Sequence, residues 1–145
     1  MECNDAHILI REGGDVTLIK YLAIPYSHLN KEVERLRFEI ANAISAFLMK
    51  NKEEVVFSPI SHSHPMVQYG VPTSWEWWGD QDRKFLDVCG ELYVTLLKGY
   101  ETSTGVNAEV AHMVEKGIKI TFLDPLELGV PLITEMVVEH DLLVG

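Results

Sequence analysis

The sequence predicts an α/β fold, specifically a Rossmann-like (flavodoxin-like) three-layer sandwich with a parallel central sheet. Short apolar runs rich in β-branched residues alternate along the chain with longer segments in which apolar residues recur every three or four positions. Alternation of this kind implies a parallel sheet with helices on both faces, and ligands of such sheets bind at the carboxyl ends of the strands. The 145 residues fit one domain, 1–145, with a core at about 17–125.

The first half of the chain predicts a strand, a long helix and a second strand. Residues 17–24 are an apolar run that stops at Pro25, as expected of a buried strand. Apolar residues then recur with helical spacing from Asn30 to about Lys50, and residues 55–57 form a short strand. The segment 58–74 contains three prolines and a glycine, which predicts a long loop that lines the functional site.

The second half continues the alternation. Its predicted elements are a helix at 75–86, a strand at 91–97, a polar turn at 98–104, a helix at 105–116 that ends before Gly117, and a strand at 118–123. The tail from Leu126 to Gly145 is too mixed in pattern to assign.

Charge and composition exclude several classes of function. Twelve lysines and arginines against 22 aspartates and glutamates give a net charge of −10, which repels duplex nucleic acid. A small anion can still bind at a local cluster of backbone N–H groups. The apolar runs are too short to span a membrane, and residues 1–14 lack the pattern of a secretory signal, so a cytoplasmic protein is expected. Cys3 and Cys89 are expected to be free thiols.

The segment from Ser103 to Glu109 is the strongest chemical signal, because it joins the end of a strand to the start of a helix. Ser103 or Thr104 can cap this helix, while Gly105 lets a small anion approach the free N–H groups of the first turn. Glu109 does not fit a capping box and flanks an apolar stripe, which makes it a candidate reactive carboxylate. The alternative is a partly exposed glutamate on the shoulder of the helix.

Two further segments could line the same site. Ser27 and His28 follow the first strand, where they either bind substrate or, for Ser27 or Asn30, cap the next helix. A second carboxylate could exchange a proton with a leaving base, and a tryptophan face could stack on that base. Asp80, Asp82 and Asp87 cluster here beside the tryptophans, and we assign these roles to Asp82 and Trp78, because structural roles fit Asp80, Trp75 and Trp77 better than Asp82.

A metal site is conceivable from His62 and His64 together with His28 and Glu76. Their spacing matches no strong metal-binding motif. Glycine fingerprints for dinucleotides and P-loops are also missing from the sequence. We therefore expect neither a metal nor a cofactor.

Taken in order, these segments resemble the nucleoside 2-deoxyribosyltransferase superfamily over residues 19–125. The resemblance lies in Tyr21-Leu22-Ala23, the tryptophan-rich segment with its aspartate, Leu92-Tyr93-Val94 and Ser103-x-Gly105-Val106-x-x-Glu109. It implies that Glu109 is the nucleophile that attacks the anomeric carbon. It further implies that Asp82 serves the leaving base and that Tyr21 orients the nucleophile.

One position bears on the reaction. Transferases of the superfamily carry an aspartate where this chain has Ser103, whereas its nucleotide N-hydrolases carry a serine that binds the 5′-phosphate. The resemblance therefore implies hydrolysis of a nucleoside 5′-monophosphate, with base transfer or a non-catalytic nucleotide sensor as alternatives. Pro25-Tyr26 departs from the glycine-serine phosphate turn of those hydrolases, and the turn from Leu97 to Thr102 is longer than theirs.

The resemblance also implies a homodimer or a higher homo-oligomer, because members of the superfamily commonly close one another's pockets. Trp75, Trp77 and Trp78 fit this expectation, since aromatic residues are enriched at protein interfaces.

Overall fold

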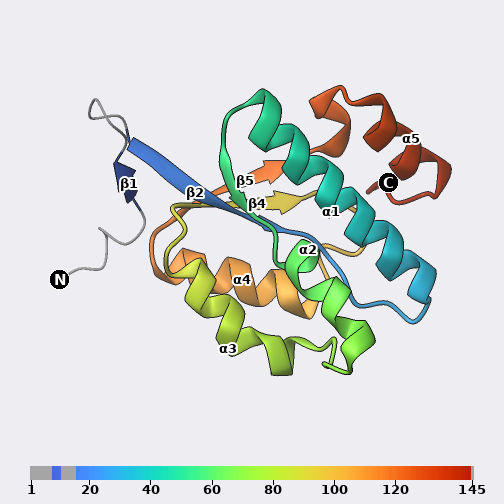
Figure 1. Cartoon of the computed structure of the whole chain (residues 1–145), viewed down its shortest axis with the longest axis horizontal. Coiled ribbons are helices and arrows are strands. Elements are labelled where there is room, and N and C mark those ends of the chain that lie inside the picture. The colour runs from blue at the N-terminus through green and yellow to red at the C-terminus, as the bar shows by residue number, and fades with distance from the viewer. Residues whose placement is uncertain (1–7, 11–15, 145) are drawn as a thin grey trace.

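The computed structural model describes residues 8–10 and 16–144 of the chain (Figure 1). Its elements, in order, are β1 (Ile8–Ile10), β2 (Val16–Ala23), α1 (Lys31–Asn51), β3 (Val55–Phe57), α2 (Pro59–Ser63), the 3-10 helix η2 (His64–Tyr69), α3 (Trp75–Leu86), β4 (Glu91–Thr95), α4 (Thr104–Glu115), β5 (Lys119–Leu123), the 3-10 helix η3 (Pro125–Leu128) and α5 (Pro131–Glu139).

Strand β2 is the centre of the sheet. It pairs in parallel with β3 on one side and with β4 on the other, and β4 pairs in parallel with β5. The register places Tyr21 opposite both Phe57 and Leu92. β1 adds an antiparallel pair at the start of β2. The predicted α/β fold with a parallel central sheet is confirmed.

Helices cover both faces of this sheet and form the outer layers of a sandwich. α1 and α5 pack on one face and α3 and α4 on the other (Figure 1). Because side chains alternate along a strand, Leu22 of β2 points toward α1, and Tyr21 points toward α3 and α4. Each face has its own apolar core.

The chain order creates a gap between two neighbouring strands. β2 leads into α1 on one face, whereas the adjacent β4 leads into α4 on the opposite face. The two loops therefore diverge at the carboxyl ends of β2 and β4, and such switch points are where open α/β sheets bind ligands.

The segment 58–74 is not the continuous loop that the sequence predicts. Ser58 caps a short helix, α2, by accepting a hydrogen bond from the Ser61 N–H, and Pro59 occupies its first turn. Proline at this position favours a helix start, because its missing N–H would be unpaired there anyway. The prediction was wrong because it interpreted Pro59 as the end of a strand alone.

The structure also shortens one predicted strand and defines the tail that the sequence left unassigned. The strand expected at 91–97 ends at Thr95, since the Leu97 N–H turns back to the carbonyl of Thr95. The unassigned tail contains η3 and α5, and Ile133 and Val137 of α5 are buried against the α1 face.

Three further expectations from the sequence concern the cysteines, the N-terminal segment and membrane-spanning helices. Cys89 is a buried free thiol, and Cys3 lies outside the described residues. Most of the segment 1–14 lies outside them as well. Among the helices that the structure describes, none is long and apolar enough to cross a membrane.

Candidate active site

A cleft of about 930 Å³ opens at the carboxyl ends of β2 and β4. It is lined by all the residues predicted to act in catalysis or substrate binding except Tyr21, which is hydrogen-bonded to the lining residue Glu109. Lining residues come from the β2–α1 loop, α1, α2, α3, the β4–α4 loop, α4 and the segment 140–142. The predicted loop segment 58–74 does line the cleft, through α2 and the residues before α3.

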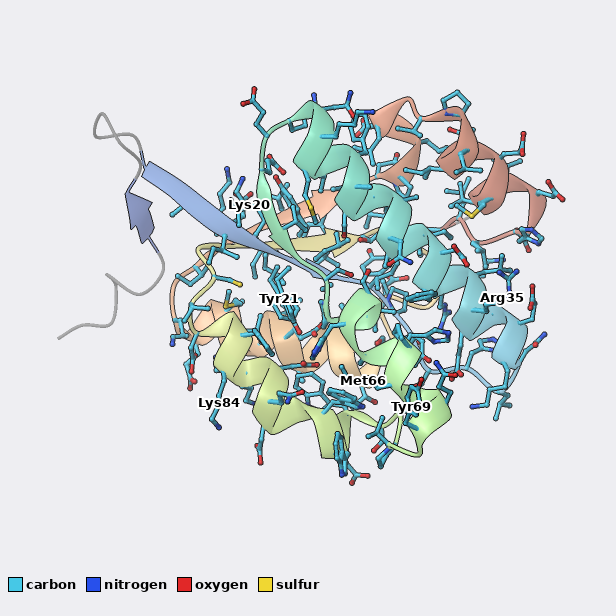
Figure 2. The ribbon with its side chains drawn as sticks, in the orientation of Figure 1. Lys20, Tyr21, Arg35, Met66, Tyr69 and Lys84 are labelled. Atoms are coloured by element: carbon cyan, nitrogen blue, oxygen red, sulfur yellow. The ribbon has the colours of Figure 1, made fainter. Side chains whose placement is uncertain are left out.

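Glu109 is the least exposed of the charged residues that line the cleft. It lies on the inward face of α4, between the buried Val106 and Met113, and its residue is 5% exposed. The hydroxyl of Tyr21, which is fully buried on β2, donates a 2.5 Å hydrogen bond to Glu109 Oε2. Figure 2 shows Tyr21 in the interior of the molecule, between the sheet and the helices below it. Tyr21 therefore fixes the orientation of the carboxyl group.

The environment of Glu109 favours its neutral form. Burial raises the pKa of Glu109 to about 8, and the nearby charge of Asp82 acts in the same direction, whereas the hydrogen bond from Tyr21 opposes the shift. In the described part of the chain, no lysine, arginine or histidine forms an ion pair with Glu109. A carboxyl group perturbed in this way inside a cleft is a candidate for catalysis.

Asp82 is the second carboxyl group of the cleft. It lies on α3, is 7% exposed, and has a pKa that burial raises to about 6. The other two aspartates of this segment point elsewhere: Asp80 is exposed and pairs with Arg83, and Asp87 binds His112 and Lys116. The structure thus brings Asp82, and neither of its neighbours, to the cleft with Glu109.

The charge of Asp82 raises the pKa of Glu109, so the two carboxyl groups interact electrostatically. With pKa values of about 6 and about 8, the pair holds one proton between those two pH values. One group can then act as an acid while the other is ionised, which is the division of roles that acid–base chemistry requires.

The start of α4 supplies donors for an anion. Ser103 caps the helix by accepting a 3.2 Å hydrogen bond from the Val106 N–H, and the Asn107 N–H bonds to the Ser103 carbonyl. The sequence predicts that the free N–H groups of the first turn bind an anion beside Gly105. Because the cap occupies the Val106 N–H, the free pair within residues 16–144 is Thr104 and Gly105.

Ser27 and His28 reach the rim of the cleft, and both are exposed. The Ser27 hydroxyl donates to the Thr73 carbonyl at 3.5 Å, and His28 Nδ1 accepts from the Asn30 N–H at 2.9 Å. Asn30 is the residue that caps α1, through the Glu32 N–H. These side chains therefore both shape the loop and face the site.

The three tryptophans have different surroundings. Trp78 is buried, lines the cleft and donates from Nε1 to the Pro72 carbonyl at 2.7 Å. Trp75 also lines the cleft and stacks under the Arg83 guanidinium. Trp77 is 52% exposed. The expected homo-oligomer stays a prediction. Of the three tryptophans that supported it, only Trp77 is strongly exposed to solvent.

The cleft is also lined by residues that were not predicted from the sequence, namely Arg37, Lys98 and the segment 140–142. Arg37 is a charged residue inside the apolar stripe of α1, next to the buried Leu36, and that position is the one sequence signal that could have revealed it. The tail reaches the cleft because the Lys98 N–H binds the Leu142 carbonyl at 2.7 Å.

The histidines considered for a metal site make other contacts. His64 Nδ1 is hydrogen-bonded to the Tyr26 hydroxyl at 2.6 Å, and His62 packs against Phe57 and Phe85. Over residues 8–10 and 16–144, no group of three or more His, Cys, Asp or Glu side chains could hold a metal ion.

Residues 18–124 match the family described as a domain of unknown function (DUF1937). The chain belongs to this family. The DUF1937 region contains Tyr21, Asp82, Ser103 and Glu109, whereas α5 and the cleft-lining segment 140–142 lie beyond it. A comparison with curated proteins finds no match.

Proposed function

We propose that this DUF1937 protein is an N-glycosidase that cleaves a nucleoside 5′-monophosphate through a covalent glycosyl ester on Glu109. The observation that carries this proposal is the buried carboxyl pair, Glu109 and Asp82, in a cleft that also contains the free N–H groups of α4. Tyr21 holds one member of the pair in a fixed orientation.

The first step needs an ionised Glu109 and a protonated Asp82. The Tyr21 O–H stabilises the carboxylate form of Glu109 by hydrogen bonding. Between about pH 6 and pH 8 the single proton still lies mainly on Glu109, so the reactive form, with the proton on Asp82, is the minor one. The Glu109 oxygen attacks C1′ of the sugar, the C1′–N bond breaks, and its electron pair leaves with the base. Asp82 donates its proton to the departing base nitrogen.

The second step releases the sugar phosphate. Asp82, now a carboxylate, removes a proton from a water molecule, whose oxygen attacks C1′ of the glycosyl ester. The ester bond breaks and Glu109 leaves as a carboxylate, which restores the single shared proton on Asp82. Two successive displacements retain the configuration at C1′, as in retaining glycosidases.

The anion site at α4 orients the substrate. A 5′-phosphate bound to the N–H groups of Thr104 and Gly105 and to the Ser103 hydroxyl would be stabilised by the positive end of the helix dipole. Glu109 lies on the next turn of the same helix. Binding the phosphate at the helix start would therefore direct the sugar ring toward the carboxylate.

A chromatographic screen of nucleosides and nucleoside monophosphates for released base tests the proposal. Glu109→Gln keeps the size of the side chain and removes the nucleophile, so base release should fall by about 10³-fold or more. Glu115→Gln, an exposed position on the same helix, is the control and should leave turnover unchanged.

Undiminished hydrolysis by Glu109→Gln would contradict the assignment. Nucleotide binding without any base release by the native protein would favour a sensor. Formation of a new nucleoside when a second base is added would favour transfer.

A further inference from the structure

Arg37 is a buried cation in the wall of the cleft. It extends from α1, is 7% exposed, and lines the same cavity as Glu109. Its Nη1 donates to the carbonyls of Tyr26 and Ser27 at 3.1 and 3.2 Å, and its Nη2 donates to the Lys98 carbonyl at 3.0 Å. These bonds join the β2–α1 loop to the β4–α4 loop.

Arg37 forms no ion pair within the described part of the chain. Its bonds go to neutral carbonyl oxygens, and no carboxylate lies within ion-pair distance. The acid that influences it, Glu34, is bound by Lys31 and by the His28 N–H. Buried charges are ordinarily paired, so the guanidinium is suited to an anionic ligand.

The guanidinium also has unused donors. It carries five N–H bonds, of which three are occupied, so two are without partners among residues 8–10 and 16–144. The other cation nearby, Lys98, is neutralised by Asp141 at 2.8 Å. His28 and His140 complete the set of basic side chains lining the cleft.

Two glycines of the segment 98–105 lie close to side chains that line the cleft. Gly99 has a φ of 97°, and a Cβ added there would lie 2.9 Å from Arg37 Nη2, so both conformation and space require glycine. Gly105 instead faces Trp75, 3.6 Å from its added Cβ. Arg37 on α1 and the start of α4 thus supply two sets of donors to the same cleft.

We propose that the cleft binds two phosphoryl groups, so that beyond the nucleoside 5′-monophosphate of the proposed function it also accepts a nucleoside 5′-diphosphate or a compound with a pyrophosphate linkage. The start of α4 holds the phosphate next to the sugar, and Arg37 holds the second phosphate. The cleft, at about 930 Å³, lies at the upper end of the usual range of roughly 300–1,000 Å³ and has room for such a ligand. This inference deepens the proposed function and rests on it.

Calorimetry with inorganic phosphate and inorganic pyrophosphate in metal-free buffer tests the two donor sets without a base or a glycosidic bond. The native protein should bind pyrophosphate about tenfold more tightly than phosphate, since a charged hydrogen-bonding pair is added. Arg37→Gln should bring this ratio close to one while changing phosphate affinity less than about threefold. Ser103→Asp should weaken both anions by about tenfold through like-charge repulsion.

Arg35→Gln is the matched control. Arg35 lies two residues away on α1, is exposed, and pairs with Glu32 and Glu39 (Figure 2). This variant should leave both affinities and their ratio as in the native protein. Circular dichroism and retained phosphate binding establish that each variant is folded. If Arg37→Gln does not fold, Arg37→Lys replaces it and should lower the ratio at least about threefold.

An unchanged ratio in a folded Arg37 variant would overturn the inference. An equal loss of phosphate and pyrophosphate would also overturn it, because both donor sets would then act on one phosphate or Arg37 would only join the loops. The outcome is separate from that of the proposed function. A protein that releases no base can still show the predicted ratio, and an active N-glycosidase can fail to show it.

Discussion

Glu109 and Glu91 are both buried glutamates beside the same sheet, with exposed fractions of 5% and 7%, yet their surroundings are opposite. Glu91 begins β4 and accepts a 2.6 Å hydrogen bond from the Thr121 hydroxyl, with Lys20 and Lys119 within 3.8 Å. Glu109 lies beyond the other end of the strands and has the Tyr21 hydroxyl in place of any cation.

The difference separates a buried carboxylate that has cations beside it from one that has none among the described residues. Cations repay much of the desolvation of Glu91, so its negative charge is compatible with a stable fold. Glu109 is desolvated without such compensation, which raises its pKa and destabilises its charged form. Groups held in an unfavourable state typically mark functional sites, where activity and stability compete.

The largest expected effect of the difference between Glu109 and Glu91 is on the pH dependence of base release. Activity needs one proton on the pair, so it should be lost below about pH 6, where both groups are protonated, and above about pH 8, where both are ionised. Beyond each limit, kcat/KM should fall about tenfold per pH unit. Glu91→Gln should retain both limits. A profile without an upper limit near pH 8 would show that Glu109 titrates normally.

Stability should respond to the two glutamates with opposite signs. The folded state raises the pKa of Glu109 above 4.5, so it binds the proton more tightly than the unfolded state, and native stability falls as pH rises from about 4.5 through 8. Glu109→Gln has no such proton and should be more stable by about 2 kcal/mol at pH 8. Glu91→Gln should be less stable by about 1–3 kcal/mol.

Urea unfolding at pH 5 and pH 8 measures both effects. The advantage of Glu109→Gln should shrink toward pH 5, where the native carboxyl group is already protonated in the folded state. A Glu109→Gln variant that is less stable than the native protein at pH 8 would contradict the unfavourable environment assigned to this carboxylate.

The smallest expected effect comes from removing the hydroxyl group that donates a hydrogen bond to each glutamate. Tyr21→Phe removes the donor that favours ionised Glu109, so the pKa of Glu109 should rise further and kcat/KM at pH 7 should fall about tenfold. Thr121→Val removes the donor to Glu91 and should leave kcat/KM unchanged. An unchanged upper limit of the pH profile in Tyr21→Phe would remove the orienting role of this tyrosine.

Local patterns were sufficient to predict most of the fold. The strand at 17–24, the helix from Asn30 and the helix at 75–86 each have a strong apolar period, and the structure places β2, α1 and α3 there. Prediction was wrong for 58–63 because proline both ends strands and begins helices, and local sequence alone does not distinguish these roles. The tail remained unassigned because α5 depends on packing against α1.

The residues of the candidate site likewise fall into those that the sequence could predict and those that it could not. Ser103 could be selected because it stands at a predicted helix start, Glu109 because it flanks an apolar stripe, and Asp82 because it lies in the tryptophan-rich segment. The structure places all three at the cleft. Arg37 and Lys98 could not be selected, since their contacts join segments 61 residues apart in the sequence. The uncompensated burial of a charge is a tertiary property that composition and spacing do not encode.

The hydrogen bond between Tyr21 and Glu109 has a consequence for folding, because it joins residues 88 positions apart. Contacts of such long range form late, after the loop entropy of the intervening chain has been overcome. A partly folded chain therefore has a hydrated Glu109 with an ordinary pKa and no oriented partner. On the proposed mechanism such a chain would release no base, so a newly synthesised protein would acquire that activity only when β2 and α4 have packed together.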